Sequence, residues 1–98
     1  MQQVFVVVWR FAADRRPHPD DKNKMMVWAE EQRTAGMLGA WGWGASPICR
    51  NAMAILTVSH MAEVLDLVMH CPVSKLCKPE IFEWVEASLS VDAMDAAQ

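Results

Sequence analysis

The stretch that decides the fold is Val4-Phe5-Val6-Val7-Val8-Trp9-Arg10-Phe11, which is dominated by β-branched and aromatic side chains. This composition is typical of a β-strand, and its apolar residues occupy both faces of that strand. We expect the aromatic face to be the exposed side of a sheet and the valine face to contact helices. Side chains alternate between the two faces of a strand. The aromatic face therefore consists of Phe5, Val7, Trp9 and Phe11, and the valine face consists of Val4, Val6, Val8 and Arg10.

The rest of the chain predicts two helices and three more strands around this first strand. An acidic residue, Asp20 or Asp21, can cap the first helix, and Gly36 suits its end. Ser59 can cap the second helix, and Pro72 ends it. The expected inward-facing residues are Met25, Trp28, Ala29 and Gln32 on the first helix, and Met61, Val64, Leu65, Val68 and Met69 on the second. The predicted strands span residues 3–11, 37–45, 52–58 and 80–86, and the helices span 20–35 and 59–71.

This order of elements, strand–helix–strand–strand–helix–strand, predicts a ferredoxin-like α+β fold. Right-handed crossovers place both helices on one face of a four-stranded antiparallel sheet. The other face would be a large exposed apolar surface, which a second copy of the sheet can cover. We therefore expect a dimeric α+β barrel: one domain over residues 1–88, a flexible tail over 89–98, and a homodimer or higher oligomer.

Composition and charge exclude several classes of partner. The chain has 98 residues, a hydrophobic fraction of 53% and a net charge of −3. Its nine basic residues are scattered along the sequence, which argues against nucleic-acid binding. The apolar runs are shorter than the roughly 20 residues that cross a bilayer, so we expect no membrane partner. Three cysteines and no leader-like start favour a reduced, cytoplasmic protein.

Several stretches resemble the muconolactone isomerase-like group of the dimeric α+β barrel superfamily. The resemblance spans about residues 28–85 and includes Gly36, Trp41, the segment 50–59, Pro72 and Glu80. It implies the fold derived above and a small homodimer. It also implies isomerase chemistry or the cofactor-free monooxygenation of aromatic compounds. Family isomerases carry an arginine after the strand-2 tryptophan, whereas here Gly42 follows Trp41.

The candidate site residues are aromatic, basic or imidazole side chains. Tryptophans can line a cavity for a flat apolar ligand, although they can equally fill a core. An arginine near a strand end can bind a carboxylate with two hydrogen bonds, and a histidine can act as a general base. The residues are Trp9, Trp41, Trp43, Arg10 and Arg50 for ligand binding, and His18 and His70 for catalysis.

The sequence contains no pattern for a metal or another cofactor. Cys71 and Cys77 are not arranged as a four-ligand zinc site, and the glycines lack the context of a dinucleotide-binding loop. Two functions remain open: a cofactor-free enzyme that acts on an apolar or aromatic small molecule, and a non-catalytic binding or assembly protein.

Overall fold

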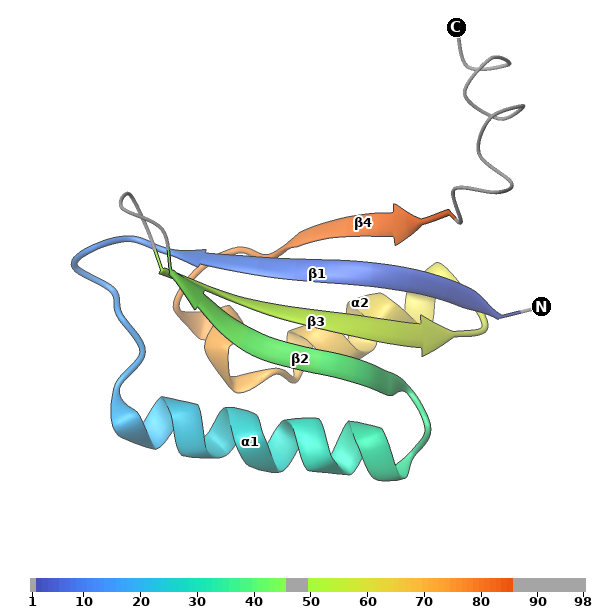
Figure 1. Cartoon of the computed structure of the whole chain (residues 1–98), viewed down its shortest axis with the longest axis horizontal. Coiled ribbons are helices and arrows are strands. Elements are labelled where there is room, and N and C mark those ends of the chain that lie inside the picture. Colours follow the sequence, from blue (N-terminus) through green and yellow to red (C-terminus); the bar gives the residue numbers. More distant parts are fainter. Residues whose placement is uncertain (1, 46–49, 86–98) are drawn as a thin grey trace, which may run out of the picture.

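The computed structural model describes residues 2–45 and 50–85, and in this part of the chain the predicted order of elements is confirmed (Figure 1). The elements are β1 (Gln3–Phe11), α1 (Pro19–Thr34), β2 (Leu38–Ala45), β3 (Arg50–Val58), α2 (Met61–Met69), a short 3₁₀ helix η1 (Pro72–Lys75) and β4 (Glu80–Trp84).

The four strands form one antiparallel sheet in the order β2-β3-β1-β4. Phe11 at the end of β1 lies opposite Arg50 at the start of β3, and Val4 lies opposite Trp84 of β4. Both crossovers pass over the same face, so α1 and α2 lie on one side of the sheet (Figure 1). The predicted ferredoxin-like α+β fold is confirmed.

The assignment of the two faces of β1 was wrong, because the aromatic face meets the helices. Phe5, Trp9 and Phe11 are buried, and they pack with Met25 of α1 and Val64 of α2. These large rings fill the space between the sheet and two helices, which the smaller valines would leave partly empty. The opposite, uncovered face consists of Val4, Val6, Val8 and Arg10 of β1, Met53 and Ile55 of β3, and Glu80, Phe82 and Trp84 of β4.

Both predicted helices are present, but the residues that they bury differ in part from those predicted. Helix α1 buries Met25, Trp28 and Ala29 as predicted, while Gln32 is half-buried. Its end is also as expected, with Gly36 in the left-handed region at a φ of 79°. The buried face of α2 is rotated from the prediction: Val64, Leu67 and Val68 are buried, whereas Met61, Leu65 and Met69 are exposed.

The N-caps are both histidines rather than the residues predicted. The N-cap residue of α1 is His18, not Asp20 or Asp21. The N-cap residue of α2 is His60, not Ser59. The last strand ends at Trp84. The predicted tail lies outside the described residues. Within the described residues, neither helix combines the length and apolarity that crossing a bilayer demands.

Candidate functional site

A pocket of about 230 Å³ opens at the end of the sheet where β1 finishes and β3 starts. The antiparallel register brings Phe11 and Arg50 together there. The loop after β1 then adds Arg16, and the first turn of α1 adds Lys22. We call this site the Trp43 pocket. Its described lining residues are Phe11, Arg16, Pro17, Lys22, Trp43, Gly44, Arg50 and Asn51.

One wall of the Trp43 pocket is aromatic. The ring of Trp43 lies 6.4 Å from that of Phe11, at an interplanar angle of 42°. On its other side Trp43 packs edge-to-face with Trp41, at a centroid distance of 5.6 Å. The Lys22 Nζ lies 5.9 Å from the centre of the Trp43 ring, within the range of a cation–π contact. The wall therefore combines an apolar ring surface with a nearby positive charge.

The charge of the Trp43 pocket is positive. Three cations line it, and none of its described lining residues is acidic. No ion pair within residues 2–45 and 50–85 involves Arg16, Lys22 or Arg50. Three cations around one hollow repel one another in the absence of a counter-charge, so the pocket favours an anion.

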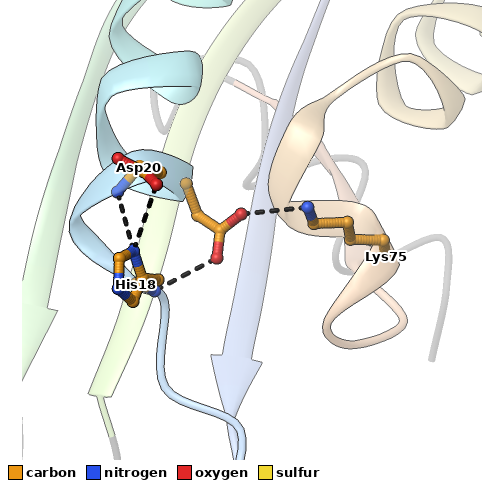
Figure 2. A network of polar contacts seen from close by, with 4 residues as sticks. His18, Asp20 and Lys75 are labelled. Atoms are coloured by element: carbon orange, nitrogen blue, oxygen red, sulfur yellow. Dashed lines mark hydrogen bonds and ion pairs between the residues drawn. The ribbon is translucent and has the colours of Figure 1, made fainter.

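A polar network next to the pocket fixes the start of α1. As Figure 2 shows, the side chains of His18, Asp20 and Lys75 gather around the first turn of α1. The Asp21 carboxylate accepts a hydrogen bond from the His18 backbone N–H at 3.1 Å, and it binds Lys75 Nζ at 3.0 Å. The Lys75 ammonium, followed by the His18 N–H, holds the pKa of Asp21 below its ordinary value. This network ties α1 to η1 and holds the turn that follows Arg16 and Pro17.

The structure separates the predicted ligand-binding residues into three groups. Trp43 and Arg50 line the Trp43 pocket, and Trp41 is half-buried beside Trp43. Trp9 lies in the core, where its indole N–H donates to the Ser74 hydroxyl at 2.9 Å. Arg10 lies on the uncovered sheet face and pairs with Glu80 at 3.2 Å.

The two candidate catalytic histidines lie outside the lining of the Trp43 pocket. His18 follows the lining residue Pro17, and its Nδ1 accepts a hydrogen bond from the Asp20 backbone N–H at 3.2 Å. His70 caps the end of α2, with Nδ1 2.8 Å from the carbonyl oxygen of Asp66. Both imidazoles are largely exposed.

Sequence reasoning missed Phe11, Arg16, Lys22 and Asn51 as site residues. Phe11 was assigned to the wrong face, and a long stretch of chain separates Arg16 and Lys22 from Trp43, Arg50 and Asn51. The available signal was the antiparallel pairing, because it brings the end of β1 to the start of β3 in the predicted fold.

The described cysteines do not form a reactive or metal-binding site. Burial raises the pKa of Cys71 to about 11, and its thiol lies 3.3 Å from the Met25 sulfur. Burial also raises the pKa of Cys77. Both thiols are therefore protonated at neutral pH. Among the described residues, no three His, Cys, Asp or Glu side chains gather as metal ligands would.

Comparison with known proteins supports the fold. No protein-family model and no curated protein matches the chain. A similar solved structure is the 5-chloro-2-hydroxyhydroquinone dehydrochlorinase TftG from Burkholderia phenoliruptrix AC1100, in complex with 2,5-dihydroxybenzoquinone. The TM-score is 0.69 at 14% identity, over 87% of this chain and 96% of that chain. At this identity the similarity shows a shared α+β fold.

Proposed function

We propose that this protein binds a small aromatic anion in the Trp43 pocket. The observation that carries the proposal is the combination of an aromatic wall with three cations that lack an acidic partner among the described residues. A carboxylate or phenolate can pair with the Arg50 or Arg16 guanidinium, and its ring can stack against Trp43.

The size of the pocket supports a ligand with a single ring. Its volume of about 230 Å³ is below the roughly 300–1,000 Å³ that is usual for drug-sized ligands. The similar structure, TftG, holds 2,5-dihydroxybenzoquinone, which is a one-ring compound with polar substituents. A ligand of this class fits the sequence-based expectation of a flat molecule with one anionic group.

Binding is better supported than catalysis. A general base must come within hydrogen-bonding reach of the proton that it removes, but neither His18 nor His70 lines the pocket. His18 lies closer along the chain, and its Nε2 is the atom left for proton transfer once Nδ1 caps α1. Proton transfer by His18 or His70 remains our enzymatic hypothesis, with binding alone as the alternative.

Titration with benzoate tests the binding proposal. Because Trp43 lines the pocket, we expect saturable quenching of tryptophan fluorescence. Arg50→Gln should weaken binding about tenfold or more, since it removes a charge-assisted hydrogen bond. Trp43→Leu should remove most of the quenching.

Arg33→Gln is the control, because Arg33 lies in the last turn of α1, away from the pocket. Benzoate binding that is equally tight in wild type, Arg50→Gln and Arg33→Gln would contradict the proposal. So would the absence of any saturable signal from benzoate, other aromatic carboxylates or phenolates.

We also propose that a second copy of this chain covers the uncovered sheet face. Met53, Ile55, Phe82 and Trp84 expose large apolar side chains on that face. Continuous apolar surface over three strands is costly to leave in water and marks an interaction site. The Arg10–Glu80 ion pair provides a polar edge to this surface, which is the usual arrangement of a protein interface.

A further inference from the structure

A groove of about 890 Å³ lies on the helix side of the sheet, along α2, η1 and the edge strand β4 (Figure 1). We call it the α2–β4 groove. It shares no described lining residue with the Trp43 pocket. Its volume lies within the roughly 300–1,000 Å³ that is usual for small-molecule sites. The lining includes Leu65, Met69, Ile81, Arg15, Lys75 and Lys78.

The walls of the α2–β4 groove are largely apolar. Leu65 and Met69 lie one turn apart on α2 and are 50% and 79% exposed. They extend the apolar surface of α2 beyond the part that packs into the core. Ile81 lies opposite Val7 in the β1–β4 pairing, so its side chain is on the same, helix-covered side of the sheet.

The hydroxyl group in these walls already has its partners. Ser74 accepts the Trp9 indole N–H at 2.9 Å and donates to the Val68 carbonyl at 2.7 Å. The walls therefore suit a ligand that has no polar groups along its length.

Positive charge gathers at one end of the groove. Arg15 follows β1, Lys75 belongs to η1 and Lys78 precedes β4, so all three lie in segments at the end of the sheet where β1 finishes. Lys75 pairs with Asp21, but neither Arg15 nor Lys78 makes an ion pair within residues 2–45 and 50–85. None of the described lining residues is acidic. This end of the groove therefore favours an anionic group.

We infer that the α2–β4 groove binds an unbranched aliphatic carboxylate, the chemistry of a medium-chain fatty acid. The carboxylate pairs with Arg15 and Lys78, and the alkyl chain lies against Leu65, Met69 and Ile81. The site is separate from the Trp43 pocket, so it does not depend on whether that pocket binds an aromatic anion.

Calorimetric titration with hexanoate, octanoate and decanoate, each below its micelle concentration, tests the inference. We expect the affinity to rise about twofold to fourfold with each added methylene, because each one buries further apolar surface. Octylammonium has the chain length of octanoate but the opposite charge, so it should bind about tenfold more weakly or worse.

Two pairs of variants at exposed positions test the two ends of the groove. Leu65→Gln should weaken octanoate binding about fivefold or more, whereas Met61→Gln, at a similarly exposed position of α2 outside the groove, should not. Lys78→Gln should weaken it by a similar factor, whereas Arg33→Gln should not. Thermal melting checks that all four variants fold.

Methyl NMR spectra of the methionines locate the bound chain directly. Octanoate should shift the signal of Met69, which lines the groove, and leave that of Met53 on the uncovered sheet face unchanged. A shift at Met53 without one at Met69 would place the chain on the sheet face and overturn the inference.

The remaining outcomes separate this groove from other sites. Octanoate binding that benzoate displaces and that Leu65→Gln leaves intact would lie in the Trp43 pocket, and the inference would fail. It would also fail if phosphatidylglycerol vesicles bound the protein while free octanoate did not, since the groove would then face a membrane. Failure of benzoate to bind would count against the Trp43 pocket alone.

Discussion

Trp9 shows at the scale of one residue how the core is built. Its ring is fully buried and packs edge-to-face against Trp28, at a centroid distance of 6.3 Å. Its N–H donates to the Ser74 hydroxyl, which in turn donates to the Val68 carbonyl at 2.7 Å. Trp9 thus links β1, α1, α2 and η1.

We expect Trp9→Ala to lower the free energy of unfolding by about 3–5 kcal/mol, because it leaves a cavity in the core. Trp9→Phe keeps most of the ring and loses the hydrogen bond to Ser74, so it should cost less, about 1–2 kcal/mol. Urea denaturation of the three proteins measures both values. A loss below 1 kcal/mol in Trp9→Ala would contradict the burial described here.

Asp21 links stability to acid through its lowered pKa. In the folded protein the pKa of Asp21 lies below the ordinary 3.8. The ionised carboxylate therefore stabilises the folded state relative to the unfolded state. That contribution is present in full above about pH 5 and is lost as the pH falls through the lowered value. Asp21→Asn should therefore cost about 1 kcal/mol at pH 7 and progressively less toward pH 3.

The control is Asp20→Asn, which removes an equal charge from the same turn but has no contact with Lys75. Urea denaturation at pH 3, 5 and 7 compares the two variants. A loss in Asp21→Asn that stays constant over this range would contradict the role given to the carboxylate.

At the scale of the element, the strands present the surface proposed to join two copies. Met53 of β3 exposes 44% of its surface on the uncovered sheet face, and Met61 of α2 exposes 45% outside that face. Met53→Lys should shift the dimer to monomer at micromolar concentration, because it buries a charge in an apolar interface. Met61→Lys should leave the dimer intact. Analytical ultracentrifugation measures both, and a monomeric wild-type protein of 11.0 kDa would contradict the proposal.

The elements also show what sequence reasoning could reach. Alternation along β1 gives the sets of residues that share a face, and this grouping is confirmed. It does not reveal which face the helices cover, since Phe5 and Val6 are both apolar and adjacent. For the candidate site too, sequence reasoning found only some of the residues. Trp43 and Arg50 stood out by residue type, whereas Arg16 and Lys22 join them only through the turn before α1.

At the scale of the whole molecule, residues 2–45 and 50–85 distribute their charges asymmetrically, although the basic residues look scattered in the sequence. Eight of the nine basic residues belong to segments that meet at the end of the sheet bearing the Trp43 pocket, and Arg33 is the exception. Four acidic residues of the described chain belong to this same end, and four others lie at the opposite end, where Arg33 is the only basic residue among those described. The eight basic residues are Arg10, Arg15, Arg16, Lys22, Lys24, Arg50, Lys75 and Lys78. The acidic residues at the same end are Asp14, Asp20, Asp21 and Glu80, and those at the opposite end are Glu30, Glu31, Glu63 and Glu83.

This asymmetry should steer an anion toward the pocket even though the net charge is −3. The Debye length falls from about 10 Å at 0.1 M salt to about 3 Å at 1 M, so salt should screen the attraction. We expect the association rate of benzoate to fall about threefold to tenfold over this range, while that of uncharged benzamide changes little. Temperature-jump relaxation of tryptophan fluorescence measures both rates.

Two arginine variants separate steering from contact with the ligand. Arg15 lies beside the lining residue Arg16 but does not itself line the Trp43 pocket. Arg15→Gln should therefore slow association and leave dissociation unchanged, whereas Arg33→Gln at the far end should alter neither rate. Equal salt dependence for benzoate and benzamide would show that the basic end does not guide the ligand. The affinity would then have to come from direct contacts with Arg50, Arg16 and Trp43 alone.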